Sequence, residues 1–205
     1  MRWGRQVAVA TMLLLAVVHH ARADALADAR KAIDGSDYLS ARPLLETALK
    51  SGTQGPGELA EIYKLTGIVE GALGEEKGAQ SAFAKWLALD PKGSLPKGTS
   101  PKITRPFDAA SAKANKAGAL AAKAETQDEP PAVTLVVTND PQKMIVGARV
   151  FFMVDRKAEQ RLEAEGTGTI KLELERGKRL DLRLQGIDEY GNRVVELGSH
   201  EVPIV

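Results

Sequence analysis

Residues 65–91 of the chain read LTGIVEGALGEEKGAQSAFAKWLALDP, and their spacing indicates a pair of helices. Apolar residues recur at every third or fourth position on both sides of the turn Gly74-Glu75-Glu76, and Asp90-Pro91 ends the pattern. Such spacing places one apolar stripe along each helix, with a glycine where the first helix stops. The stretch therefore predicts an antiparallel helical hairpin with a buried seam, in which Trp86 is a core residue.

A second copy of this pattern precedes it along the chain. Its break is Gly35-Ser36-Asp37, and Leu26, Ala29 and Ile33 form the stripe of the helix before that break. When the two copies are superimposed, three apolar pairs coincide: Ala41 with Ala79, Leu45 with Phe83 and Leu49 with Leu87. Tandem copies of a helical hairpin predict a stack in which each hairpin buries its apolar face on its neighbour.

Residues 65–91 resemble a tetratricopeptide repeat (TPR) in their small residues, Gly67 and either Gly71 or Ala72, in their turn and in the closing Asp90-Pro91. The resemblance extends more weakly over about residues 24–91, where the first helix lacks the family's usual tryptophan and the loop Gly52–Gly57 is longer than the family's. It implies a surface that binds a peptide or a partner helix. The residues expected to line that groove are Glu61, Lys64 and Glu70.

A further helix is expected after residue 100, because Ser100 suits the position before a helix and Pro101 its first turn. Pro106 would place its start or a kink nearer Thr104. Its apolar face is made mostly of alanine: Phe107, Ala110, Ala114, Ala117 and Ala121. The stretch TQDEPP, residues 126–131, then reads as a stiff linker, because its two prolines cannot continue a helix.

Beyond residue 131 the apolar residues alternate with polar ones, as they do in half-buried strands. Strands are predicted around residues 133–137, 149–155, 170–174, 180–184, 195–197 and 202–204. Short strands at this spacing favour an immunoglobulin-like or fibronectin-type sandwich. The predicted fold class is α+β with several domains: TPR-like helical hairpins over 24–125, a linker over 126–131 and an all-β immunoglobulin-like sandwich over 132–205.

The segment 1–23 has the pattern of a secretory signal peptide, with Arg2 and Arg5 before an apolar run and Ala21-Arg22-Ala23 at its end. Cleavage after Ala23 would place the mature protein in the periplasm of a bacterium or outside the cell, with no integral membrane segment. The chain has no cysteine, so neither disulfides nor a lipid-bearing cysteine are expected. The leader holds three of the 28 basic and none of the 27 acidic residues, which leaves a net charge of −2 and predicts no nucleic-acid or anionic-lipid partner.

Near the C-terminus, DEYGN at residues 188–192 gathers polar side chains that could suggest a catalytic or metal site. Gly191 and Asn192 favour a turn instead, between a strand ending near Ile187 and one starting near Arg193. Ser199 and His200 are adjacent in sequence, so in a strand they would point to opposite faces and could not act as nucleophile and base. No catalytic, metal-binding or cofactor-binding residue is expected.

These observations predict a non-enzymatic envelope adaptor or scaffold that binds a protein or peptide through its repeats. The alternative is a carbohydrate- or cell-wall-binding module that uses the sandwich, although Tyr190 is the one obvious aromatic residue for it. A further possibility is a subunit of a larger envelope machine. Phe151 and Met153 would be core residues if a second sheet covers them, and otherwise an exposed docking patch.

Overall fold

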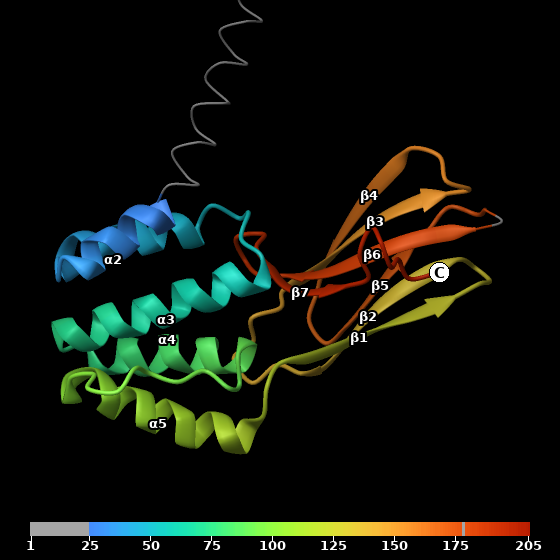
Figure 1. Ribbon diagram of the computed structural model, residues 1–205. Helices are drawn as coiled ribbons and strands as arrows, with labels where there is room; N and C mark the ends of the chain where they lie inside the picture. Colours follow the sequence, from blue (N-terminus) through green and yellow to red (C-terminus); the bar gives the residue numbers. More distant parts are fainter. Residues whose placement is uncertain (1–24, 178) are drawn as a thin grey trace, which may run out of the picture.

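The computed structural model describes residues 25–177 and 179–205, and in it a helical part precedes a β part (Figure 1). The predicted signal peptide lies outside the described residues. Residues 25–34 are helical, and four further helices follow: α2 (Tyr38–Leu49), α3 (Pro56–Leu73), α4 (Glu76–Leu89) and α5 (Pro101–Ala117). The expected order of helices first and strands second is therefore confirmed.

Local signals in the sequence stop and start these helices as predicted. Asp37 caps α2, because its carboxylate accepts a hydrogen bond from the Ser40 amide at 3.2 Å. Gly74 ends α3 with a left-handed φ of 87°. Ser100 precedes α5, whose first residue is Pro101, so Pro106 lies inside the helix and does not begin it.

Helix α3 is buried on two sides. On one side it packs against α4 and α5 around Phe83, Trp86 and Phe107, whose rings lie 5.4 to 6.1 Å apart. On the other side Ile62 and Val69 belong to a separate core formed with α2 and residues 25–34. The four labelled helices lie one beside the next in chain order, so α5 is at the end of the stack (Figure 1).

The β part consists of two antiparallel sheets that face each other. The strands are β1 (Ala121–Gln127), β2 (Ala132–Asn139), β3 (Gly147–Val154), β4 (Glu159–Glu165), β5 (Thr169–Glu173), β6 (Leu180–Ile187) and β7 (Arg193–Leu197). Their order is β1-β2-β5 in one sheet and β4-β3-β6-β7 in the other. Val133, Leu135, Val150, Phe152 and Leu184 fill the space between the sheets.

The region between the two parts differs from the prediction. The alanine-rich helix ends at Ala117 and does not reach Ala121, because Gly118 takes a φ of 78°. Residues 121–127 form β1, which pairs with β2, so the stretch 126–131 is the end and turn of a β-hairpin and not a linker. The link between the parts is the short segment 118–120.

Two other details of the β part were not expected. Strand β4 was not predicted at all, although it pairs with β3 over its full length. Conversely, the strand predicted at 202–204 is reduced to one bridge between Ile204 and Leu182.

Candidate interaction surfaces

The turn at residues 188–192 joins the sandwich to the helices. Asn192 is fully buried, and its side-chain amide donates to the carbonyl oxygen of Leu49 at 2.7 Å and to Asp188 Oδ2 at 2.9 Å. Its Oδ1 accepts from the amide of Gln54 at 3.0 Å. Leu49 is the last residue of α2, where backbone carbonyls lack partners within the helix. Asn192 therefore caps a helix of the other part of the molecule.

Asp188 holds this turn in shape. Its side chain is 7% exposed and accepts hydrogen bonds at 2.9 Å from the amides of Tyr190 and Asn192 as well as from the Asn192 side chain. All of these donors belong to the turn itself. The prediction of a turn between two strands is thus confirmed, and Asp188 satisfies the turn's own donors.

The loop after α2 receives this turn. Gly52 has a φ of 71°, and a Cβ on it would lie 2.2 Å from the carbonyl oxygen of Tyr190. The Arg193 amide donates to Gln54 O at 2.9 Å, and its guanidinium donates to Thr53 O at 3.1 Å. This loop is therefore the docking site of the turn.

A second asparagine stabilises the other connection between the helices and the sandwich, the segment 118–120. Asn139, at the end of β2, donates to the carbonyl oxygens of Ala117 at 3.0 Å and Ala119 at 2.6 Å. It therefore caps the C-terminus of α5, as Asn192 caps that of α2. The amide of Leu120 also donates to Ala88 O at 2.9 Å. With two separate attachments, the helical stack and the sandwich hold a fixed orientation.

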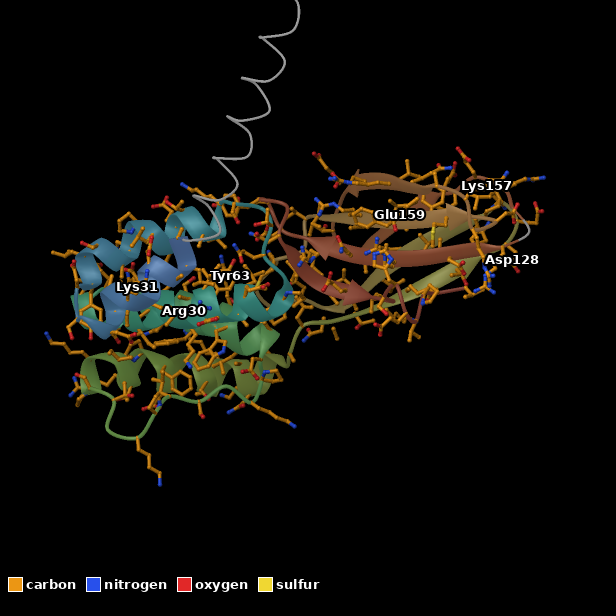
Figure 2. All side chains as sticks on the ribbon, turned by 45° about the horizontal axis from the view of Figure 1, so that its top comes forward. Arg30, Lys31, Tyr63, Asp128, Lys157 and Glu159 are labelled. Carbon is orange, nitrogen blue, oxygen red and sulfur yellow. The ribbon has the colours of Figure 1, made fainter. Side chains whose placement is uncertain are left out.

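Tyr63 of α3 lies near the contact between the turn at residues 188–192 and the loop after α2, a contact that we call the joint. Figure 2 shows Tyr63 among the helices, whereas Asp128 and Lys157 lie at the far end of the sandwich. Lys85 Nζ lies 5.1 Å from the centre of the Tyr63 ring. Burial, followed by the nearby charge of Asp188 and Glu189, raises the pKa of the Tyr63 hydroxyl far above its usual value.

This raised pKa predicts a loss of stability in alkali. The folded state holds the Tyr63 proton more tightly than the unfolded state, so the stabilisation is complete below the unfolded pKa of about 10 and is lost as the pH rises above it. Above that pH, the free energy of unfolding should fall more steeply in the parent than in Tyr63→Phe, by up to about 1.4 kcal/mol per pH unit. Urea unfolding of both proteins between pH 8 and pH 11 measures the difference, and parallel curves would contradict it.

An open groove of about 340 Å³ lies between α2 and α3. Leu45, Leu49 and Val69 form its apolar floor together with Thr66, and Arg42, Glu46 and Glu70 form its charged rim. Arg42 Nε donates to Glu70 Oε1 at 2.7 Å across the groove. Leu39, which is 74% exposed, lies two turns before Glu46 on the same face of α2 and extends the apolar surface.

The three residues predicted to line one groove lie on different sides of α3. Glu61 pairs with Arg30 of the first helix at 2.6 and 2.7 Å, and these bonds lower the pKa of Glu61. Lys64 Nζ lies 5.5 Å from the Trp86 ring of α4. Glu70 lines the groove between α2 and α3. Nine positions separate Glu61 from Glu70, which is two and a half helical turns, so the two carboxylates point in opposite directions.

The outer face of the four-stranded sheet is neither a bare apolar patch nor part of a second hydrophobic core. Phe151 is half-buried there, with the guanidinium groups of Arg161 and Arg183 at 5.9 and 4.8 Å from its ring centre. Arg183 also pairs with Glu159 at 2.6 Å, and both Arg149 and Arg161 pair with Glu163. Phe151 is therefore neither in the core nor part of an exposed docking patch, because arginine side chains cover its ring.

The C-terminal Ser199 and His200 lie in an exposed turn, closed by the Val202 amide that donates to Ser199 Oγ at 3.0 Å.

Within residues 25–177 and 179–205, no group of three or more acidic, histidine or cysteine side chains is placed to hold a metal ion. In the same residues, no helix has the length and apolar character needed to cross a membrane.

The chain matches no protein-family model, no curated protein and no solved structure. Its function is therefore inferred from its own surfaces.

Proposed function

We propose that this protein is a non-enzymatic adaptor of the bacterial cell envelope, which binds a segment of a partner protein through its helical stack. The observation that supports this most is the groove between α2 and α3, with an aliphatic floor and an ion-paired rim. A groove of this kind accepts an apolar side chain of a peptide or helix, while the rim pairs with polar groups beside it.

The joint between the helices and the sandwich gives a physical reason to expect that the protein is a scaffold. Leu49 lines the groove with its side chain and accepts the Asn192 hydrogen bond with its carbonyl. A partner held in the groove would therefore sit at a fixed position relative to the sandwich. This geometry suits a protein that positions one partner with respect to another surface.

The finer fold assignment is part of this proposal. The hairpin of α3 and α4 is TPR-like in its turn at Gly74 and in the close contact of Gly67 with Phe83. In the sandwich the second strand pairs with the fifth, and the third, sixth and seventh are neighbours, as strands B and E and strands C, F and G are in immunoglobulin domains. The leader pattern supports export to the periplasm or beyond.

Crosslinking in intact cells tests the groove. A photoreactive amino acid at Glu46, on the rim, should yield an adduct with a defined protein, whereas the same group at the exposed Glu76 of α4 should not. Thr66→Arg should abolish the Glu46 adduct because it fills the groove. Thr47→Arg is the matched control, because both threonines bond the carbonyl four residues earlier but Thr47 lies on the exposed side of α2.

The pattern of adducts decides the outcome. Equal adducts from Glu46 and Glu76, or a Glu46 adduct that survives Thr66→Arg, would show that the groove is not the binding element. Loss of the Glu46 adduct in Thr66→Arg, with its retention in Thr47→Arg, would agree with the proposal.

One observation favours the carbohydrate-binding alternative. Tyr190, 37% exposed, lies in a polar hollow of about 710 Å³ beside the joint, with Arg149, Glu163 and Glu189 among its lining residues. Aromatic rings bind sugars by packing against their apolar faces, but a single partly exposed ring offers little area. Retention of the protein on immobilised cell-wall glycans, lost in Tyr190→Ala, would favour this alternative over the adaptor.

A further inference from the structure

Helix α5 presents a row of unpaired positive charges at the end of the stack. Residues 91–117 contain six basic residues and one acidic residue, Asp108. Four of the basic residues share the exposed side of α5: Lys102, Arg105, Lys113 and Lys116. We call these four the basic row. The adjacent side of the helix buries Ile103, Pro106 and Ala110 against the stack.

The basic row differs from the cations of residues 25–50, at the other end of the stack. Arg30, Lys31, Arg42 and Lys50 each pair with a carboxylate. Among the described residues, none of the four members of the basic row forms an ion pair. Asp108, the one acidic residue of α5, is exposed on its flank. The row therefore keeps its full positive charge toward solvent.

The four residues of the basic row lie along a straight line on the outer surface of α5. Lys102 and Lys116 are fourteen positions apart, which is about 21 Å along a helix. Figure 1 shows α5 as the outermost helix, with no element on its far side among those drawn in colour. The positions between the charges on this face are alanines, Ala109 and Ala112. The surface thus has charge but no groove.

We propose that the basic row binds the anionic headgroups of a membrane surface. A stable protein interface needs a well-packed centre of large side chains, and α5 offers none on this face. The large exposed hydrophobic residues of the described chain lie elsewhere, at Leu39, Val146, Leu162, Tyr190, Val202 and Val205. Adsorption to an anionic membrane needs only several cations close to its plane and no apolar insertion. The stack would then lie end-on against the membrane, with the α2–α3 groove and the sandwich free.

Vesicle sedimentation tests this proposal with the chain as it is isolated from cells. The probes are phosphatidylcholine vesicles with and without about 30% phosphatidylglycerol, a fraction chosen to give a clear surface potential. The test variant replaces Lys102, Arg105, Lys113 and Lys116 by glutamine. The control variant replaces four exposed basic residues of the sandwich by glutamine, namely Lys143, Lys157, Lys171 and Arg176, and so removes the same charge.

The parent should prefer the anionic vesicles at low salt, and the test variant should lose at least about tenfold of that partitioning. The control variant should lose less than about twofold. The preference should vanish at about 0.5 M salt, because screening shortens the range of the field. Any leader still present acts equally on all variants, so the difference between the parent and the test variant isolates the row.

Three outcomes would overturn the proposal: no preference of the parent for anionic vesicles, an equal loss in both variants, or a row-dependent binding to polyglutamate without binding to vesicles. The last would assign the row to an acidic polypeptide. The proposal does not depend on the groove, since Thr66→Arg should leave vesicle binding unchanged.

Discussion

Asn192→Ala should lower the free energy of unfolding by about 3 kcal/mol and loosen the joint between the helices and the sandwich. The side chain is fully buried and makes three hydrogen bonds, to Leu49, Gln54 and Asp188. Alanine leaves a carbonyl of α2, an amide of the following loop and a carboxylate oxygen with one partner fewer. A buried polar group that loses its partner costs about 1–3 kcal/mol.

Asn192→Asp tests the hydrogen bonds that Asn192 donates without changing the size of the side chain. It keeps the shape of the side chain but cannot donate to Leu49, and it places a second carboxylate beside Asp188, whose Oδ2 is 2.9 Å from Asn192 Nδ2. It should therefore destabilise the protein at neutral pH at least as much as alanine does. Asn115→Ala, at an exposed position of α5, is the matched control and should change stability by less than about 0.5 kcal/mol.

Urea unfolding measures the stability, and amide hydrogen exchange locates the effect. The amides of Gln54 and Arg193 both donate across the joint, so their exchange should accelerate in Asn192→Ala more than that of amides inside β3. A stability within about 0.5 kcal/mol of the parent, which is the range of an ordinary surface substitution, with unchanged exchange at these two amides, would rule out a structural role for Asn192 in the joint.

The joint shows which part of such a site a sequence can predict. The residue types at 188–192 identify a turn, because Gly191 and Asn192 tolerate its backbone angles and Asp188 can bond its amides. The partners of Asn192 lie 138 and 143 positions away, at Gln54 and Leu49. No local pattern indicates such a contact. The one available signal was the length of the glycine-rich loop 52–57.

The missed strands have a related cause. Strand β1 has the sequence AAKAETQ and β4 has EQRLEAE, both rich in residues that favour helices. They become strands because each pairs along its length with a strongly apolar neighbour, β1 with β2 and β4 with β3. Sheet pairing overrides local propensity where the neighbour supplies the hydrogen bonds. The helix boundaries at Asp37, Gly74 and Asp90, which depend on nearby residues, were predicted correctly, whereas the end of α5 was not.

The surfaces were predicted least well, for two separate reasons. Glu61 and Glu70 were assigned to one groove, although helical periodicity alone places them on opposite sides of α3. The net charge of −2 suggested no basic surface, because the acidic residues of the rest of the chain balance the cations of residues 91–117. A count of charge by segment and by helix face would have detected the basic row.

Gly67→Ala should cost about 2 kcal/mol, although alanine is normally the better helix residue. Gly67 lies in α3 against the ring of Phe83, and a Cβ there would approach Phe83 Cδ1 and Cε1 to 2.5 Å. The ring cannot move away easily, because it is fully buried and packs edge-on against Phe107 at 5.4 Å. The added methyl group must therefore push α3 and α4 apart, and overpacking of this kind costs about 1–3 kcal/mol.

Gly57→Ala is the matched control, because Gly57 lies in the same helix with nothing within 4 Å of an added Cβ. It should stabilise the protein by up to about 1 kcal/mol through helix propensity alone. Phe83→Leu should reduce the cost of Gly67→Ala, so that the double variant is more stable than the sum of the single effects predicts, by about 0.5 kcal/mol or more. Thermal and urea unfolding of the four proteins measure this coupling. If Gly67→Ala and Gly57→Ala changed stability alike, α3 and α4 would not be in the close contact that Gly67 makes with Phe83, and the groove that α3 forms with α2 would lose its rigid support.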